Sequence, residues 1–480
     1  MLSRSDFLGS GFVIGTGLSV ELGSQFARTV VLARILGASE FGLVAAAFSL
    51  VAIVEMAGSI GLDRYLVYSA DGGEQRALDA SHTLALARGV LSAVVLAILA
   101  QPAAAIIGES QYVGSFVFVA TIPFLRGFTH LGVAQMQRDG CFWRSAVAEG
   151  GGTFFGFVVA IVAARLLPDH RAGLWSLGGQ TVATVLATHV LSRARVYQLS
   201  FDWRGIKEPL RYGLPLTVNG LAVAIATQLD RLVVGAWLGV AALGVYTLTV
   251  SLIVQPLSLV ARLVTTLLQP LLSSAWRSDP SGRLRRQAWR IVLGSGLLGL
   301  VGATGVMFLG APTLFLVFGP RYFVDDSVFV IFGAVVLLRS VRNPLSLLGL
   351  AIGRTSDLMV SNLAGAVGLL VAVAALFVRP TIAASVFGIM VGDFLSFIVL
   401  EMRLHAYLDK FRRPALTTLA AASLVLALLA AWMLIGGPDL WFRVAATAIV
   451  AALAILAARK LSSWTLRLDN GAAERGSSIL

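Results

Sequence analysis

The sequence predicts an all-α polytopic membrane protein of about 14 transmembrane helices, arranged as two six-helix lobes related by a repeat plus two C-terminal helices. Of the 480 residues, 57% are apolar and only 13% are charged, whereas soluble domains carry about 25% charged residues. Apolar stretches long enough to cross a membrane recur at nearly even spacing. The basic residues fall mainly between alternate stretches, as positive-inside topology requires.

This composition excludes a soluble enzyme, a disordered chain and a secreted domain built on disulfides. Cys141 is the single cysteine of the sequence, which excludes an intrachain disulfide and a thiolate metal cluster. We therefore expect no enzymatic activity, no cofactor and no metal. The net charge of +12 reflects 37 basic against 25 acidic residues. We expect no nucleic-acid partner, because membrane topology accounts for the basic surplus.

We expect a helix at each of fourteen apolar stretches, with kinks where Gly and Pro interrupt them. The first stretch lacks the compact leader and cleavage site of a secretory signal, so we expect it to be retained. The expected helices are residues 8–35, 41–62, 78–101, 113–135, 145–165, 173–192, 210–237, 242–272, 289–310, 327–350, 357–378, 381–402, 415–436 and 441–459.

The distribution of Lys and Arg predicts that both termini are cytoplasmic. With the N-terminus inside, 24 basic residues lie in inner segments and four in outer loops, while nine lie within or at the edges of spans. This asymmetry is a strong orientation signal. The four outer residues are Arg165, Arg171, Arg321 and Arg379.

An internal repeat relates the two halves of the chain. LARILGASEFGLVAAAFSL (32–50) and VGAWLGVAALGVYTLTVSL (234–252) match at an offset of 202, which aligns Gly37 with Gly239 and Gly42 with Gly244. Each copy reads as a helix, a short outer turn and a second helix. Because each half holds an even number of spans, both have the same orientation, and transporters built this way bind substrate between the halves. A generic turn pattern is the alternative.

The repeat divides the chain into lobes and linkers. The predicted parts are an N-lobe of helices 1–6 (1–192), a cytoplasmic linker (193–209), a C-lobe of helices 7–12 (210–403), a basic cytoplasmic linker (404–414), helices 13–14 (415–459) and a cytoplasmic tail (460–480).

Four phrases carry a family resemblance: LARILGASEFGLVA, LRYGLPLTVNGLAVAIATQLDRLVVGAWLGVAALGVYTLT, QMQRDGCFWR and LAIGRTSD. In them the chain resembles the polysaccharide (lipid-linked oligosaccharide) flippases of the multidrug/oligosaccharidyl-lipid/polysaccharide exporter superfamily, over roughly residues 5–410. The resemblance implies two six-helix lobes around a cationic cavity in the bacterial inner membrane. It also implies alternating access that moves polyprenyl-pyrophosphate-linked oligosaccharide units, of exopolysaccharide or O-antigen type, from the cytoplasmic to the outer leaflet. Membrane lipid, a polysaccharide polymerase and export proteins are the implied partners.

Polar side chains inside the expected spans are the candidate substrate site. A charge at mid-membrane costs about 2.5–3.5 kcal/mol on insertion scales, so it faces a wet interior or a partner. Guanidinium groups suit a pyrophosphate, because they stay charged and bind two oxygens at once. Structural pairing, such as Arg28 with Glu21, is the alternative, as is snorkelling to the interface. The substrate-binding candidates are Arg28, Arg88, Arg126, Arg262, Gln25, Gln255 and Asn219.

Three acids, Glu21, Glu55 and Asp230, are the candidates for coupling transport to a cation or proton gradient. A unit charge that crosses 100 mV is worth about 2.3 kcal/mol, so a few moved charges can drive a cycle. A role as counter-ions of buried arginines is the alternative. Glu149 is a further intramembrane acid, and His130 is read as a satisfied interior histidine.

Other functions remain open at this stage. A lipid II flippase is the nearest alternative, followed by a multidrug or metabolite cation antiporter of the same superfamily. The mid-span arginines argue against a pocket for cationic drugs. A membrane glycosyltransferase or ligase usually needs large outer loops with acidic or metal-binding residues. The longest expected outer loop here, about 311–326, carries only two acidic residues, Asp325 and Asp326. A scaffold without transport does not explain the paired halves.

The topology is testable with reporter fusions. We predict cytoplasmic activity for reporters at residues 205 and 282 and outer activity near residues 108 and 318, because the basic residues mark the inner side. Paired fluorescent-protein and alkaline phosphatase fusions measure both sides. The opposite labelling pattern would overturn the orientation.

Overall fold

The computed structural model describes residues 4–192, 197–278 and 283–405, together with Ser423, Arg443, Thr447 and Val450. For residues 4–14 the description is limited to the backbone. The expected helices at 415–436 and 441–459 and the tail lie outside the described residues, apart from these isolated positions.

The described chain is built from helices, as the sequence predicts. The elements are α1 (Arg4–Leu36), α2 (Ala38–Ala57), α3 (Leu62–Tyr68), η1 (Ala70–Gly73), α4 (Gln75–Ile106), η2 (Ser110–Tyr112), α5 (Val113–Phe118), α6 (Thr121–Arg126), α7 (Gly132–Arg138), α8 (Trp143–Leu166), α9 (Arg171–Leu191), α10 (Trp203–Ser278), α11 (Arg283–Phe318), α12 (Asp326–Ala351), α13 (Thr355–Val378) and α14 (Ile382–His405).

Eight helices in the described part of the chain are long and apolar enough to cross a membrane. Most bounds agree with the expected spans to within a few residues. Because α11 continues to Phe318, the expected outer loop at 311–326 shortens to the residues between α11 and α12. The eight segments are Ala38–Ala57, Gln75–Ile106, Trp143–Leu166, Gly205–Ala261, Arg290–Phe318, Asp326–Ala351, Thr355–Val378 and Ile382–Leu404.

The chain divides into two compact units. Unit 1 comprises Met1–Gln255, Leu314–Phe323 and Ala372–Ser385, and unit 2 comprises Pro256–Thr313, Val324–Val371 and Val386–Leu480. Helices α1 to α9 and the first part of α10 therefore belong to unit 1. The lobe boundary at residues 193–209 stays a prediction.

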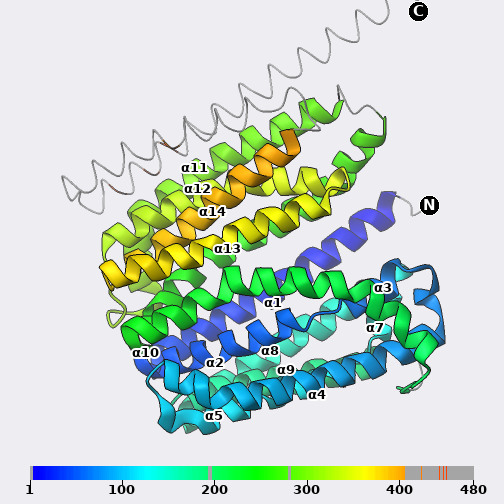
Figure 1. The fold of residues 1–480 in the computed structure, drawn as a ribbon, viewed down its shortest axis with the longest axis horizontal. Coiled ribbons are helices and arrows are strands. Elements are labelled where there is room, and N and C mark those ends of the chain that lie inside the picture. Colours follow the sequence, from blue (N-terminus) through cyan, green and yellow to red (C-terminus); the bar gives the residue numbers. More distant parts are fainter. Residues whose placement is uncertain are drawn as a thin grey trace, which may run out of the picture. The chain divides into compact units, whose positions relative to one another are not determined.

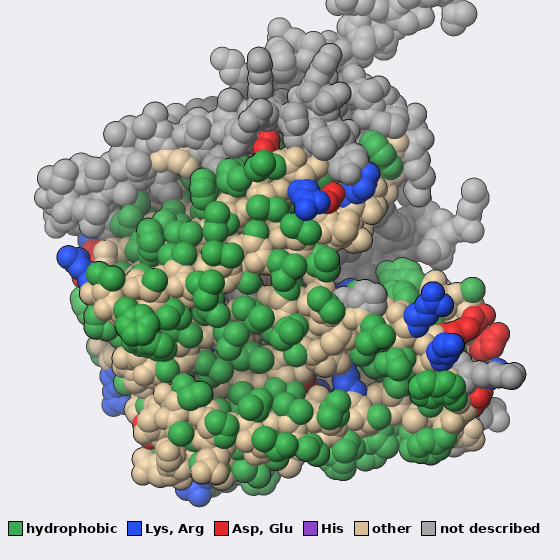
Figure 2. Space-filling model, viewed as in Figure 1, with side chains coloured by type: hydrophobic (Ala, Val, Ile, Leu, Met, Phe, Trp, Pro, Cys, Tyr) green, Lys and Arg blue, Asp and Glu red, His purple; other side chains and the backbone are tan. Residues whose placement is uncertain are grey.

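Within unit 1, α8 packs against both α1 and α9, and α4 packs against α5 and α6 (Figure 1). Small residues bring α1 and α8 together, since a Cβ added at Gly17 would lie 2.6 Å from the Cβ of Ala146. Large apolar side chains such as Leu91, Ile98 and Phe154 point outward. Figure 2 shows hydrophobic side chains across much of the described part of the visible face, which is the surface that a lipid environment requires.

The expected helix at 113–135 is instead three short helices, α5, α6 and α7, with a non-helical segment between Arg126 and Gly132. Side chains take over the backbone donors at this break. The backbone N–H groups of His130, Leu131 and Gly132 donate to the Thr188 hydroxyl and to the His82 and His130 rings, at 3.1 Å each. These bonds replace helical ones, so the break leaves none of the three donors unsatisfied.

The repeat found in the sequence has a structural counterpart inside unit 1. Gly37 (φ 83°) and Gly239 (φ 82°) occupy equivalent turns in a conformation that favours glycine. A Cβ at Gly42 would strike the carbonyl oxygen of Val240, and a Cβ at Gly244 would strike that of Ala38. The two contacts exchange under the offset of 202, which is the signature of a local two-fold relation between the two helical hairpins.

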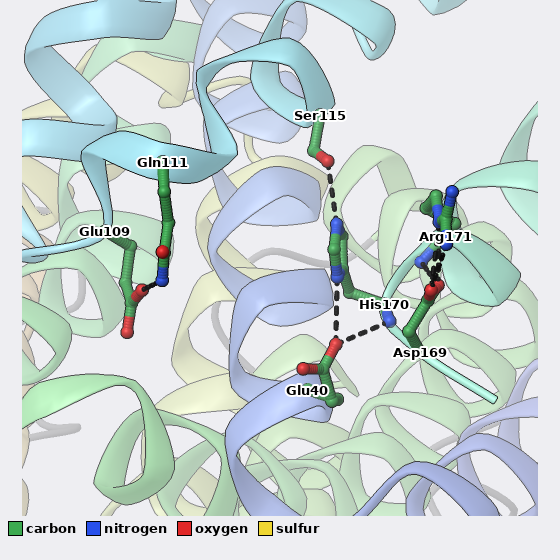
Figure 3. Close-up of polar contacts among 7 residues, drawn as sticks. All are labelled: Glu40, Glu109, Gln111, Ser115, Asp169, His170 and Arg171. Atoms are coloured by element: carbon green, nitrogen blue, oxygen red, sulfur yellow. Dashed lines mark hydrogen bonds and ion pairs between the residues drawn. The ribbon is translucent and has the colours of Figure 1, made fainter.

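A second polar contact joins the ends of α2, α5 and α9. The Glu40 carboxylate accepts from the backbone N–H and from the ring Nδ1 of His170, both at 2.8 Å, and Ser115 lies 2.7 Å from Nε2 of the same ring (Figure 3). Beside it, Arg171 donates to Asp169 at 2.6 Å and holds the pKa of that carboxyl below its ordinary value. One histidine thus connects three helix ends.

The glycine contact yields a stability prediction. Gly42→Val places side-chain atoms against the backbone of Val240, which cannot move aside cheaply, so we expect a loss of about 1–3 kcal/mol and a lower unfolding midpoint. Differential scanning fluorimetry of the full-length protein in detergent measures this. Gly151→Ala is the matched control, because no atom lies within 4 Å of its added Cβ. Equal midpoints for both variants would contradict the close approach.

Candidate functional site

A pocket of about 410 Å³ lies within unit 1, where α1, α3, α7, α8 and α9 meet the break between α6 and α7. Its lining combines acidic, hydroxyl, amide and apolar side chains. The lining residues are Gly17, Leu18, Glu21, Asp63, Thr129, His130, Leu131, Val133, Ala134, Gln137, Phe142, Ser145, Ala146, Ala148, Glu149 and Thr188.

Three carboxylates, Glu21 of α1, Asp63 of α3 and Glu149 of α8, line this pocket from three different helices. With the described residues, their side chains form neither hydrogen bonds nor ion pairs. The charges of Glu21 and Asp63 act on Glu149, so the three groups share one electrostatic environment. Carboxylates without protein partners inside a membrane protein require water or a ligand.

Arginines lie next to this acidic pocket. Arg126, at the end of α6, forms an ion pair with Glu55 of α2, and the arginine side chain keeps 37% exposure against 18% for the glutamate. The Arg126 charge also reaches Glu149 and Arg28. The pair is therefore one face of a charged cluster that continues into the pocket.

Arg88 and Arg28 differ in their surroundings. Arg88 of α4 lies within range of the charges of Glu55, Asp63 and Arg126, and within the described chain it makes no hydrogen bond or ion pair. Arg28 of α1 is only 5% exposed, donates to Oε1 of Gln180 on α9 and lies 5.7 Å from the centre of the Phe48 ring. Arg28 thus contributes positive charge from a buried position. The guanidinium group of Arg88 has no acceptor within the described chain and is available to a ligand.

The remaining predicted residues lie elsewhere in the chain. Asp230 and Tyr246, both on α10, share a buried hydrogen bond in which the tyrosine hydroxyl donates. The Oε1 atom of Gln255 is buried without a partner, and Asn219 and Gln25 are half-buried on α10 and α1. The side chain of Arg262 lies outside the described residues. The structure brings Arg28, Arg88, Arg126, Glu21 and Glu55 into one cluster. Gln25 lies between Glu21 and Arg28 on α1, and Asn219, Asp230 and Gln255 lie on α10.

Intramembrane arginines of unit 2 have protein partners. Arg339 donates to Asp393 at 2.7 Å, Arg342 donates to Asn362, and Arg403 pairs with Asp357 at 3.4 Å. Such pairs offset the cost of burying a charge. They leave the described guanidinium groups of unit 1 as the better candidates for a ligand.

The pocket wall includes one member of a histidine cluster. The His130 ring lies in edge contact with those of His82, at 4.8 Å, and His189, at 5.2 Å, and Tyr197 stacks on His82 at 4.3 Å. His130 accepts the N–H of Gly132 at Nδ1, which places its proton on Nε2, and this buried Nε2 has no partner. The sequence-based reading of His130 as a satisfied interior residue is therefore wrong for this atom.

Sequence reasoning missed Asp63 as a site residue and named Glu149 only as one of several acids. It searched for charges in the middle of apolar stretches, and Asp63 follows the end of α2. A signal was nonetheless present, because the expected helix at 41–62 places Asp63 directly after a span, and in the structure it is an exposed residue in the first turn of α3.

The arrangement sets positive and negative groups side by side. Within the described chain, no group of three or more His, Cys, Asp or Glu residues converges closely enough to hold a metal ion. The site is suited to binding a ligand that presents an anionic part to Arg88 and Arg126 and a polar part to the pocket.

Comparison with known proteins places the chain in a family. The family described as "Polysaccharide biosynthesis protein" matches residues 31–324. The lipopolysaccharide biosynthesis protein WzxC of Escherichia coli (strain K12) is 24% identical over 341 residues, which cover 70% of this chain and 68% of WzxC. The succinoglycan biosynthesis transport protein ExoT of Rhizobium meliloti (strain 1021) is 23% identical over 335 residues, which cover 68% of this chain and 64% of ExoT.

A solved structure supports the fold. The lipid II flippase MurJ in an inward closed conformation superposes with a TM-score of 0.69 at 12% identity, and the match covers 95% of this chain and 99% of MurJ. The expected helical transporter fold is thereby confirmed, while the count of fourteen spans stays a prediction. The chain belongs to the polysaccharide biosynthesis protein family, as a multi-pass membrane transport protein and not an enzyme.

Proposed function

We propose that this protein is a flippase that moves polyprenyl-pyrophosphate-linked oligosaccharide units, of exopolysaccharide or O-antigen type, from the cytoplasmic to the outer leaflet of the bacterial inner membrane. The single observation that carries the proposal is the cluster of Arg88 and Arg126 beside a polar pocket inside unit 1. The named relatives WzxC and ExoT support a polysaccharide role.

The arginine cluster suits the pyrophosphate. A headgroup that enters the membrane loses its hydration, and guanidinium groups replace that water with charge-assisted hydrogen bonds. Arg88 lacks a protein acceptor within the described chain, so it binds phosphate oxygens without first breaking a bond. Arg126 exchanges its bond to Glu55 for one to the ligand, and Arg28 adds positive potential from its buried position.

In this proposal Glu55 links substrate binding to coupling. When a phosphate takes Arg126, Glu55 loses its ion-pair partner. Headgroup binding then changes the electrostatic surroundings of this coupling candidate. Glu21 in the pocket and Asp230 beside Tyr246 remain the further coupling candidates predicted from the sequence. The two repeat halves rock about the contact of Gly42 with Gly244 in this proposal.

The arginines provide the direct test. We expect Arg88→Ala and Arg126→Ala to lower polysaccharide export at least tenfold at unchanged membrane protein levels, because each removes a ligand contact. Arg28→Ala lowers both export and thermal stability, because it also breaks the bond to Gln180. Export is measured in a flippase-deficient strain, and immunoblots of membranes measure the protein level. Thermal melting of the purified protein measures the stability of Arg28→Ala. The matched control is the exposed Arg165→Ala, and normal export by Arg88→Ala would refute the assignment.

The coupling role of Glu55 is tested separately. Glu55→Gln keeps the size of the side chain but cannot take up a proton, so we expect translocation of a fluorescent lipid-linked disaccharide in proteoliposomes to lose its stimulation by a pH gradient. The exposed Glu74→Gln serves as control and keeps that stimulation. A Glu55→Gln protein that responds to the gradient like the wild type would exclude this carboxylate as the coupling group.

A further inference from the structure

We propose that the pocket lined by Glu21, Asp63, Glu149 and His130 is a sugar subsite that selects neutral or amino sugars and rejects acidic ones. This inference rests on the proposed function and deepens it, because it assigns the oligosaccharide and the pyrophosphate of one ligand to two adjacent places. The three carboxylates that line the pocket have no hydrogen-bond or ion-pair partner within the described chain.

The geometry of the acids argues for a sugar over a metal ion. A metal needs oxygen atoms that converge on one point, at about 2.3–2.6 Å for calcium, and the pocket acids do not belong to any group of described residues that converges in this way. A volume of about 410 Å³ is that of a small-molecule site. Acceptors spread over such a space match a ligand whose hydroxyl groups are themselves spread over rings.

The second observation is the unpartnered ring nitrogen of His130. This residue is 2% exposed, lines the pocket and carries its proton on Nε2, because Nδ1 accepts the N–H of Gly132. A buried N–H without an acceptor costs about 1–3 kcal/mol and calls for a ligand oxygen. A metal ion has no use for a donor, whereas a sugar hydroxyl or acetamido oxygen accepts from it.

The lining supplies the other groups that bind sugars. Thr129 adds a hydroxyl group, and Phe142 adds an apolar wall. Gln137 adds its amide oxygen, since its amide nitrogen donates to Ser145 at 2.7 Å. The carboxylates accept from sugar hydroxyls in charge-assisted bonds. Together the donors and acceptors match the two-way hydrogen bonding of a hydroxyl group.

The broken helix points to the same place. Residues Thr129, His130 and Leu131 belong to the break between α6 and α7 and also line the pocket. Non-helical backbone at membrane depth is tolerated where it lines a cavity or is buried in protein. The chain is therefore non-helical in the segment that forms part of the pocket wall.

Charge sets the selectivity. A uronate in the pocket meets three carboxylates at close range and is repelled, whereas a neutral sugar is not and an amino sugar is attracted. The pyrophosphate is drawn instead to Arg88 and Arg126, which lie within electrostatic range of Asp63 and Glu149. The opposite charges of the two places orient the headgroup.

Binding to the full-length protein in nanodiscs tests the inference. Three probes share a citronellyl pyrophosphate anchor: one carries N,N′-diacetylchitobiose, one carries a disaccharide ending in glucuronate, and one carries no sugar. We expect the wild type to bind the neutral probe at least tenfold more tightly than the acidic one. In the double variant Asp63→Asn, Glu149→Gln that ratio falls to within about twofold. The sugar-free probe binds this variant at least as tightly as the wild type, because two negative charges near Arg88 and Arg126 are removed.

Controls separate the possible failures. The exposed Glu74→Gln keeps the wild-type ratio, and thermal melting checks that every variant is folded. If the sugar-free probe binds but the neutral and acidic probes bind equally, the subsite is refuted and the proposed function stands. If the sugar-free probe does not bind at all, the proposed function fails. Sodium binding lost in the double variant, with the sugar ratio unchanged, would reveal a cation site and overturn the inference.

Discussion

The cost of placing a charge inside a membrane governs the interior of this protein. A guanidinium or carboxylate in a low-dielectric region needs an opposite charge, a hydrogen-bond partner or water. Unit 1 uses partners for Arg126, which pairs with Glu55, and for Arg28, which donates to Gln180. Glu21, Asp63 and Glu149 lack such partners within the described chain, so the space that they line must hold water or a ligand. The same constraint that stabilises the ion pairs therefore marks this pocket as the proposed substrate site.

Backbone hydrogen bonds obey a related constraint at the break between α6 and α7. A missing helical turn in a membrane leaves donors that cost several kcal/mol each unless other groups accept them. Thr188, His82 and His130 accept three consecutive N–H groups there. This requirement explains the positions of His82 and His130 beside the break. It also fixes the tautomer of His130 and leaves its buried Nε2 proton without an acceptor within the described chain.

Much of the fold followed from the sequence, because a span is encoded locally by its apolar length and its flanking charges. The hairpins at Gly37 and Gly239 followed as well, because two segments with matching sequence patterns are expected to form matching turns. The break in the helix expected at 113–135 did not, because its acceptors, such as Thr188, come from distant segments. For the same reason the sequence identified Arg88 and Arg126 as buried charges but missed the gathering of Asp63 with Glu149, which depends on how α3 and α8 pack.

The C-terminal end of α1 is completed by residues from much later in the chain. Arg34 donates to the carbonyls of Leu316 and Val317 at the end of α11, where it complements the helix dipole, and Tyr322 donates to the Ala33 carbonyl at 2.6 Å. Burial raises the pKa of Tyr322 to about 12, so this hydroxyl keeps its proton. At a translation rate of about 5–20 residues per second, α1 waits on the order of ten seconds or more for these partners to leave the ribosome. Biogenesis of the first unit thus ends only after much of the second has been synthesised, and fragments expressed separately would each lack part of their own fold.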